Sequence, residues 1–218
     1  MICAIVLAAG QSHRMGTQKL LLPFGATTVI AHIVDQLLRS IIDKIYVVVG
    51  YERNRITKEL SGRPISIVTN PDYKAGMLSS VRCGLQALPK KCEAVLVALG
   101  DQPSITSELA DEMVQSFTRT DKGILVPLYR GKHGHPILFS ELYCDEIFTR
   151  YDNVGLRGLL LAHPEDIFEL SVSTSAVLLD MDSPEDYQRQ LTSLQDNTEK
   201  SHNSQGELNL RGSTGPTA

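Results

Sequence analysis

A small-residue loop carrying two cations follows the first apolar run of the chain. Ala8, Ala9 and Gly10 have almost no side chain, so a ligand can approach the backbone closely there. Arg14 and Lys19 follow as the only Lys or Arg residues between positions 1 and 38. Arginine grips phosphate oxygens with a planar fork, whereas lysine supplies a mobile point charge. The spacing predicts a polyphosphate-binding loop, with a solvated polar surface loop as the alternative.

Acidic residues recur further along the chain, where they could hold a cation against such a phosphate. Asp101 lies two residues after the apolar run 94–99, which places it just beyond the end of an expected strand. A carboxylate beside a triphosphate favours a bridging Mg²⁺ ion, although Asp101 could instead cap a helix that begins near Ser104. Asp180 and Asp182 alternate along an extended segment, so both can face one pocket. For Asp182, capping of the helix that starts at 183–186 is the competing interpretation.

The elements that must position these residues alternate between two patterns. Continuous apolar runs predict buried strands, and three- and four-residue spacing between them predicts amphipathic helices, with Thr27 or Thr28 and Ser104 as N-caps. We therefore predict a mostly parallel sheet in a doubly wound α/β fold, and ligands of such folds bind beyond the carboxyl ends of the strands. The expected strands are Ile2–Leu7, Ile45–Val49, Ile65–Val68, Ala94–Leu99 and Ile124–Pro127, and the expected helices are Thr28–Arg39, Arg53–Leu60, Met77–Leu88 and Ser104–Phe117.

The pattern changes after Pro127, where a short strand at 135–139 and helices near 141–149 and 153–162 are expected. A strand pair near 167–180 and a helix over about 184–194 should follow. We expect one domain over 1–195, with 1–128 binding the nucleotide and 129–195 folding over the sheet to bind an acceptor. Residues 196–218 are polar with two leucines and no aromatics, which predicts a disordered tail.

Composition narrows the partners of the protein. The 218 residues are 42% hydrophobic, enough for one sizeable core, and the net charge of -4 argues against a broad nucleic-acid or acidic-membrane surface. The four cysteines are far apart without CxxC spacing, as expected for reduced thiols in the cytoplasm. The six-residue N-terminal apolar run is too short for a signal peptide or membrane span. No GxGxxG or GxxxxGK[ST] motif occurs, which excludes the common dinucleotide and P-loop signatures.

Five ordered motifs together carry a family resemblance that covers the chain to about residue 195. The chain reads LAAGQSHRMGTQKLLLPFG at 7–25, NPDYKAGMLSSVRCGL at 70–85, ALGDQP at 98–103, GHPILF at 134–139 and LLDMDSPEDY at 178–187. In order and spacing these motifs resemble those of the molybdenum cofactor cytidylyltransferases. The resemblance implies a Rossmann-like, three-layer α/β/α nucleotidyltransferase fold. It also implies transfer of CMP from CTP to molybdopterin, with Mg²⁺ as cofactor and pyrophosphate as leaving group.

The resemblance also implies roles for individual residues. Arg14, Lys19 and Asp101 would be catalytic, and Asp101 and Asp180 would hold the metal ion. Ala at position 9, where guanylyl-transferring relatives have Gly, points to CTP. The nucleotide-binding set would comprise Leu7, Ala8, Ala9, Gly10, Arg14, Lys19, Gly76, Ser79, Ser80 and Asp101. For Ser79 and Ser80, ordinary capping of the helix that they open is the alternative.

The acceptor side is implied by the GHPILF motif. His135 would contact the acceptor, and Arg157 is a second candidate, although relatives often carry GDxGAR where this chain has Asn153 and Val154. A tight turn stabilised by Gly134 and Pro136 explains the same motif. A zinc site at His133 and His135 lacks further ligands at metal spacing.

Two rival functions remain open at this point. One keeps the chemistry with guanylyl transfer or another acceptor, such as a sugar phosphate or methylerythritol phosphate. The other is a non-catalytic protein that holds a nucleotide-modified cofactor for a molybdoenzyme. A molybdoenzyme or its chaperone is also the expected protein partner of the catalytic alternative.

Overall fold

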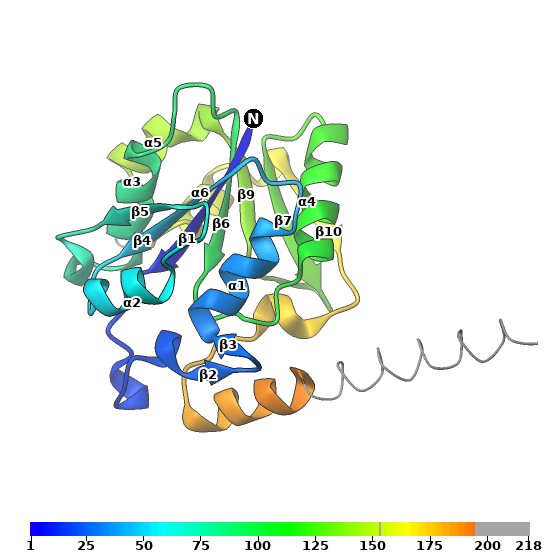
Figure 1. Ribbon diagram of the computed structural model, residues 1–218. Helices are drawn as coiled ribbons and strands as arrows, with labels where there is room; N and C mark the ends of the chain where they lie inside the picture. The colour runs from blue at the N-terminus through cyan, green and yellow to red at the C-terminus, as the bar shows by residue number, and fades with distance from the viewer. Residues whose placement is uncertain (153, 195–218) are drawn as a thin grey trace, which may run out of the picture.

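A computed structural model describes residues 1–152 and 154–194 of the chain. Its centre is an eight-stranded sheet in the order β10-β7-β9-β6-β1-β4-β5, with β8 paired to β7 (Figure 1). All pairings except those of β8 and β9 are parallel. The predicted mostly parallel α/β fold is therefore confirmed. The strands are β1 (Ile2–Ala8), β4 (Lys44–Val49), β5 (Ser66–Thr69), β6 (Ala94–Leu99), β7 (Ile124–Tyr129), β8 (Lys132–His133), β9 (Ile137–Ser140) and β10 (Ile167–Ser171).

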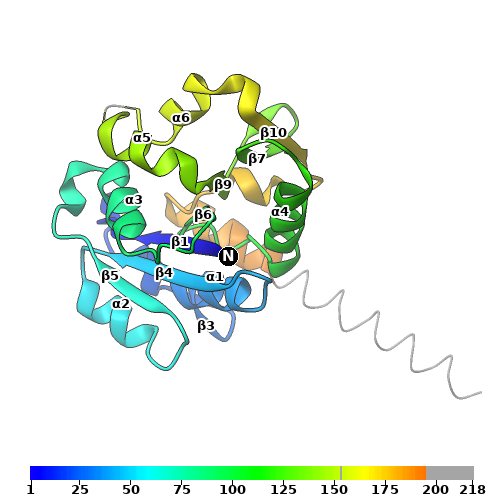
Figure 2. The ribbon, with the colours of Figure 1, turned by 90° about the horizontal axis from the view of Figure 1, so that it is seen from above.

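Helices cover both faces of this sheet and form two hydrophobic cores (Figure 2). One core packs α1, α2 and α4 against the sheet, and the other packs α3, α5 and α6 against the opposite face. The central strands bury side chains on both faces, which explains their continuous apolar runs. The helices are α1 (Val29–Leu38), α2 (Arg53–Glu59), α3 (Met77–Gln86), α4 (Ser107–Arg119), α5 (Cys144–Thr149) and α6 (Arg157–Ala162).

Most of the expected helix ends are confirmed, but Ser104 is not an N-cap. Thr28 caps α1 through a hydrogen bond that its hydroxyl accepts from the amide of Ala31. Thr106 caps α4 in the same way, so the helix begins two residues later than a Ser104 cap would place it. The Ser104 hydroxyl instead donates to Gln190 at 3.1 Å. Asp101 is likewise too far from the helix start to cap it.

Residues after Pro127 cover one face of the sheet with α5 and α6, and they also supply strands to it, which was not expected. β9 lies between β6 and β7 and pairs antiparallel with both, so the second part of the chain completes the sheet. The expected strand pair near 167–180 was also wrong. β10 pairs with β7, but Ser175–Leu178 is a 3-10 helix, and the Thr174 hydroxyl caps it by accepting from the amide of Ala176. This local side-chain hydrogen bond competes with strand pairing.

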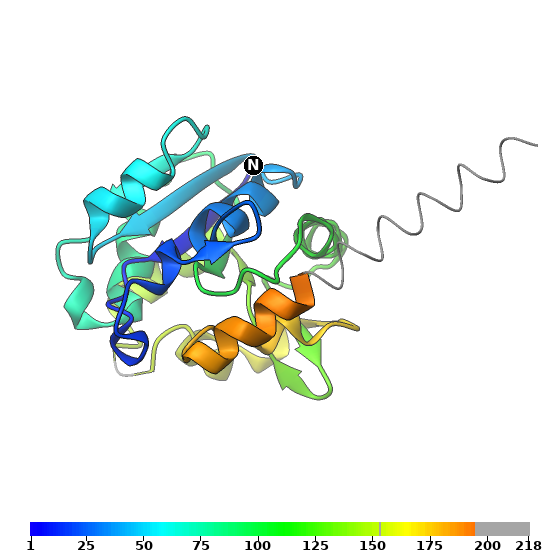
Figure 3. The same cartoon turned by 60° about the horizontal axis from the view of Figure 1, so that its bottom comes forward.

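The small β2–β3 hairpin (Pro23–Phe24 and Thr27–Thr28) lies below the sheet beside the helical segment 184–194 (Figure 3). The Tyr187 hydroxyl donates to the carbonyl of Pro23 at 2.7 Å, which fixes the two segments together. The acidic segment before this helix is thereby brought next to the N-terminal loop. The predicted tail at 196–218 lies outside the described residues. Among the helices of the described ranges, none has the length and apolarity needed to cross a membrane.

Candidate active site

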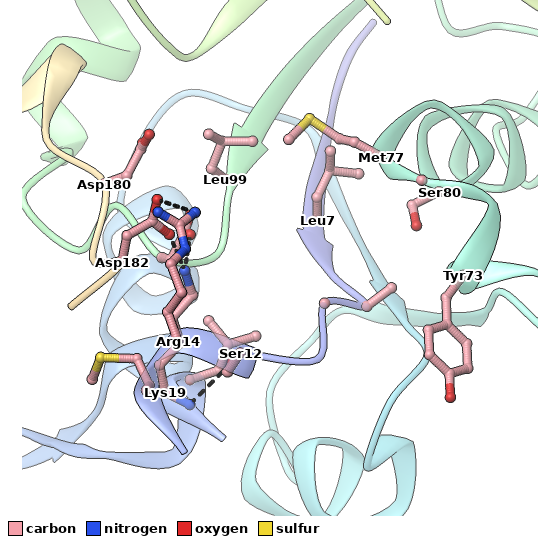
Figure 4. Close-up of a pocket in the computed structure, with 16 residues that line it drawn as sticks. Leu7, Ser12, Arg14, Lys19, Tyr73, Met77, Ser80, Leu99, Asp180 and Asp182 are labelled. Carbon is pink, nitrogen blue, oxygen red and sulfur yellow. Dashed lines mark hydrogen bonds and ion pairs between the residues drawn. The ribbon is translucent and has the colours of Figure 1, made fainter. Parts of the chain in front are cut away.

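A cavity of about 470 Å³ opens where β1 and β6 end, at the edge of the sheet that the fold predicts for ligands. Its floor is apolar, one wall is charged, and the opposite wall comes from the start of α3 (Figure 4). The lining residues are Leu7, Ala9, Gly10, Ser12, Arg14, Met15, Lys19, Leu20, Tyr73, Gly76, Met77, Ser80, Leu99, Asp101, Asp180 and Asp182.

The loop after β1 is shaped by Gln18, a buried residue that the sequence analysis missed. Its side-chain amide donates to the carbonyl of Gly10 at 3.2 Å, and its oxygen accepts from the Ser12 hydroxyl at 2.9 Å. Ser12 and Gly16 both adopt positive φ, so the loop makes two tight bends between Ala9 and Lys19. The bends bring both cations of the loop to the cavity. Only the position of Gln18 immediately before Lys19 in the motif could have signalled this role.

The charged wall is an alternating cluster of cations and carboxylates. The Lys19 ammonium lies 2.5 Å from Asp101 and 3.0 Å from Asp182, and the Arg14 guanidinium lies 2.8 Å from Asp182. Figure 4 shows Arg14 and Lys19 both pointing toward Asp182. Segments about 80 residues apart in the sequence thus meet at one point. The structure brings together the predicted residues Arg14, Lys19 and Asp101, and it adds Asp182 to them.

Burial alone would lower the pKa of Lys19, but the carboxylates of Asp101 and Asp182 outweigh it and raise that pKa. Lys19 therefore remains cationic throughout the neutral range. Because the pKa of Lys19 is raised, the stability that its ion pairs with Asp101 and Asp182 contribute is present at neutral pH. It is lost only when the pH rises through the pKa of Lys19 in the folded protein.

Asp180 occupies a different environment from the other two acids. Burial raises the pKa of Asp180, although a hydrogen bond from Gln102 opposes the shift. The Gln102 amide donates at 2.7 Å, while its oxygen is buried without a hydrogen-bond partner among the described residues. The backbone amide of Met181 donates to the Asp101 carbonyl at 3.1 Å, which holds the two acidic segments side by side. The sequence analysis missed Gln102 because a lone amide has no spacing signature.

The carboxylates fit a divalent cation of the Mg²⁺ type. Hard oxygen ligands are what such an ion prefers, and Mg²⁺ is commonly held by one or two carboxylates together with substrate phosphates. In the part of the chain that the structure describes, no cluster of three or more His, Cys, Asp or Glu residues has metal-binding geometry. Asp101 and Asp180 would therefore need phosphate oxygens to complete a coordination shell.

The wall opposite the cations is built around Asn70, which was also missed. Its buried side-chain amide donates to the hydroxyls of Ser79 and Ser80 at 2.9 and 3.0 Å, and its oxygen accepts from the amide of Asp72. Gly76, with φ of 104°, provides the sharp turn into α3. The first turn of α3 is thus fixed at the cavity edge.

Substitution of Asn70 by alanine is expected to lower the free energy of unfolding by about 1–3 kcal/mol, because the buried partners of its amide lose their hydrogen bonds. Thermal unfolding of the Asn70→Ala protein measures this change. Asn54→Ala, at an exposed position, is the matched control. A melting temperature equal to that of the control would contradict the role given to Asn70.

Two residues of the predicted nucleotide-binding set do not line the cavity. The Ala8 side chain points into the core beneath α1 because side chains alternate along β1. The Ser79 hydroxyl donates to the backbone carbonyls of Asp72 and Gly76. The N-cap of α3 is Gly76, without a side-chain capping bond, so the capping alternative for the two serines is wrong. The other members of the set line the cavity, as does Asp180.

A second cavity of about 1540 Å³ adjoins the first, since Gly76 and Met77 line both. The predicted acceptor residues His135 and Arg157 both lie in its wall. Burial lowers the pKa of His135, against the opposing charges of Asp180 and Asp101. The imidazole is thus neutral at physiological pH. The amide of His135 also donates to the Val177 carbonyl at 2.9 Å, which links this turn to the segment before Asp180.

Comparison with known proteins agrees with this geometry. The chain is 29% identical over 187 residues to the molybdenum cofactor cytidylyltransferase of Escherichia coli (strain K12), covering 85% of this chain and 93% of the relative. The solved structure of Rv0371c from Mycobacterium tuberculosis H37Rv superposes with a TM-score of 0.79 at 27% identity, covering 88% of this chain and 97% of that one. A manganese complex of Rv0371c superposes with a TM-score of 0.76 at 26% identity, covering 88% and 98%.

Residues 4–167 match the model of the MobA-like NTP transferase domain. This match spans the loop with Arg14 and Lys19, the Asn70 turn, Asp101 and the GHPILF motif. The chain therefore belongs to the MobA-like NTP transferase family and is a nucleotidyltransferase.

Proposed function

We propose that the protein transfers CMP from CTP to molybdopterin, forming molybdopterin cytosine dinucleotide and pyrophosphate. The observation that carries this proposal is the cluster of Arg14 and Lys19 with Asp101 and Asp182, which lines a cavity that adjoins a second, larger one. The smaller cavity suits a nucleoside triphosphate, and the larger one suits a pterin that bears a phosphate. The E. coli relative, which carries the name of this reaction, supports the same assignment.

The reaction needs positioning and charge neutralisation more than acid or base catalysis. A phosphate oxygen of molybdopterin forms a bond to the α-phosphorus of CTP, and the bond from that phosphorus to the bridging oxygen of pyrophosphate breaks. An ionised phosphate is already a nucleophile at neutral pH, so no general base is required. Arg14 and Lys19 stabilise the negative charge that develops on the departing pyrophosphate.

Lys19 has to exchange partners for this to happen. In the structure its ammonium is bound by Asp101 and Asp182, so an arriving triphosphate competes with the carboxylates for the cation. Asp101 and Asp180 would hold Mg²⁺, which when bound would supply positive charge that offsets the negative charge of the phosphates. Lys19 and Arg14 would turn from Asp101 and Asp182 toward the phosphates.

Chelation of divalent cations is expected to abolish transfer, because the carboxylates would repel the triphosphate without a metal ion. Pyrophosphate release is followed before and after addition of EDTA, and then with excess Mg²⁺ or Mn²⁺. Activity should return with either ion. Turnover that persists after exhaustive chelation would contradict the metal role of Asp101 and Asp180.

The preference for CTP rests on the narrow floor beside Ala9. The methyl group of Ala9 packs close to the backbone of Gly50. A Cβ atom added to Gly50 would lie 2.9 Å from the Ala9 methyl group and 2.6 Å from the Tyr73 side chain. The Ala9 methyl group itself lines the nucleotide cavity, so it leaves less space for a base at the end of β1 than a glycine would. A pyrimidine base between Tyr73 and the start of α3 suits the available space.

The test compares pyrophosphate release from CTP, GTP and ATP at equal concentration, with Mg²⁺ and molybdenum-loaded molybdopterin. Release with CTP alone supports the proposal. Release with GTP would reassign the base and keep the mechanism. Release only when molybdopterin is replaced by a sugar phosphate or methylerythritol phosphate would reassign the acceptor.

We also propose where the enzyme acts and which protein receives its product. All four cysteines carry free thiols, in agreement with the cytoplasm as the proposed location. A molybdoenzyme or its chaperone is the proposed recipient of the product.

A further inference from the structure

Helix α3 borders both cavities and is seated tightly on the sheet. Gly76 and Met77 at its start line the two cavities, as described above. Further along the helix, Gly84 lies so close to β1 that an added Cβ would come within 2.8 Å of the Ile5 side chain. Interiors packed this closely do not deform readily. A side chain that projects from α3 can therefore act as a fixed anchor for neighbouring segments.

Arg82 is such a side chain, and it binds the end of α5 and the segment that follows it through three separate donors. Its Nε donates to the carbonyl of Ile147 at 2.8 Å, and its Nη2 donates to the carbonyl of Arg150 at 2.7 Å. Its Nη1 pairs with the Asp152 carboxylate at 2.5 Å. The side chain is only 24% exposed, so the bonds are partly shielded from water. The guanidinium spreads its donors over three nitrogens in a rigid plane, whereas the three donors of an ammonium group all lie on one nitrogen.

The segment that Arg82 holds adopts a backbone conformation that is unfavourable by itself. Tyr151 has φ of 75°, in the left-handed region that residues with a side chain rarely occupy. Its hydroxyl donates to Glu146 at 2.5 Å, and its ring packs so closely over Gly158 that any Cβ there would clash. Conformations of this kind persist where surrounding contacts enforce them. Arg82 binds the residues on both sides of Tyr151 and so supplies part of that enforcement.

The same segment forms a wall of the larger cavity. Asp152, Gly155 and Arg157 line it, whereas Arg82 itself lines neither cavity. Gly155 is tied to Tyr151 by a backbone hydrogen bond of 2.9 Å from its amide to the Tyr151 carbonyl. A change in the backbone at Tyr151 would therefore move the start of α6 and the guanidinium of Arg157 with it.

We propose that Arg82 is a positioning residue for the acceptor, which acts by fixing the wall that carries Asp152 and Arg157. The inference rests on the proposed function, since it takes the larger cavity as the acceptor site. Arg82 reaches this wall from α3, the helix whose start borders the nucleotide. The nucleotide cavity does not depend on the three bonds of Arg82, so the effect of losing them should fall on the acceptor alone.

The experiment compares Arg82→Gln and Arg82→Lys with wild type and with Arg55→Gln. The control removes a guanidinium that pairs with Glu52 at 2.8 Å on α2, away from both cavities. Both Arg82 variants should raise KM for molybdopterin about tenfold, since small displacements of binding groups have effects of this size or larger. The dissociation constant for CTP, measured by titration calorimetry, should stay at the wild-type value, as should both constants in Arg55→Gln.

Two results would overturn the inference. One is a KM for molybdopterin in Arg82→Gln equal to that of the control, and the other is a parallel loss of CTP affinity, which would indicate a general loss of structure. Lack of turnover by wild type would instead overturn the proposed function. Calorimetric binding of molybdopterin to wild type and Arg82→Gln would then decide the inference, because equal affinities or no binding would refute it.

Discussion

Replacement of Lys19 by alanine is expected to reduce kcat/KM for transfer by about 100- to 1,000-fold, or roughly 3–4 kcal/mol of transition-state stabilisation. The ammonium is only 12% exposed and sits between two carboxylates at the mouth of the phosphate-binding loop. Its positive charge therefore lies where little water screens it, and there it stabilises the negative charge on the departing pyrophosphate most strongly. The folded structure should survive, because Gln18 and the buried Leu20 still anchor the loop.

The measurement is steady-state kinetics with CTP and molybdopterin, together with thermal unfolding of the same samples. Lys74→Ala is the matched control, since Lys74 is an exposed cation next to Tyr73 that does not line the cavity. The control should keep the wild-type rate. Near-normal turnover of a folded Lys19→Ala protein would refute the catalytic role of Lys19.

Replacement of Asp101 by asparagine is expected to lower kcat by at least about 100-fold and to raise the Mg²⁺ concentration needed for half-maximal activity. Asparagine preserves the shape of the side chain but removes the charge that would hold the cation. Lys19 keeps its partner Asp182 at 3.0 Å in this variant, so the loop should remain in place. The shift in metal dependence separates this effect from that of Lys19→Ala, which removes a cation and should leave the metal requirement closer to wild type.

A titration of activity against Mg²⁺ concentration measures both parts of this expectation. Asp121→Asn, at an exposed position outside the cavities, controls for the change in net charge. If Asp101→Asn showed the wild-type metal dependence with a lowered rate, Asp101 would serve only to orient Lys19. A wild-type rate would exclude any catalytic role.

The local elements were predictable from the sequence because their signals are local. The apolar runs of β1 and β6 and the Thr28 cap of α1 can be seen in a few neighbouring residues, and the structure confirms them. The place of β9 between β6 and β7 was not predictable in this way. Strand order depends on pairing between distant segments, and a four-residue strand carries no signal of its neighbours.

The charged residues of the site were predictable, but the residues that support them were not. Arg14, Lys19 and Asp101 stand out as charges beside apolar runs, and the structure places them together. Gln18 and Asn70 act through buried amides, and a single amide in a polar segment looks like a surface residue until its partners are known. Buried polar groups must find partners, so these amides become visible only in the folded chain.

The contacts of Asp180 and Asp182 were also not predictable from the sequence. The sequence analysis gave Asp180 the larger role and left Asp182 between support and helix capping. In the structure Asp182 pairs with both cations of the loop, while Asp180 is held by Gln102. Which acid pairs with the cations and which accepts from Gln102 depends on contacts with segments about 80 and 160 residues away. No local sequence pattern encodes these contacts.

Transfer of the α-phosphate of CTP to molybdopterin is the most direct test of the proposed reaction. The full chain is incubated with Mg²⁺, molybdenum-loaded molybdopterin and CTP labelled in its α-phosphate, and the labelled products are separated and identified by mass. We expect the label to appear in molybdopterin cytosine dinucleotide, with one pyrophosphate released for each molecule formed. Label that remains in CTP, or that appears only as free CMP, would contradict cytidylyl transfer to this acceptor.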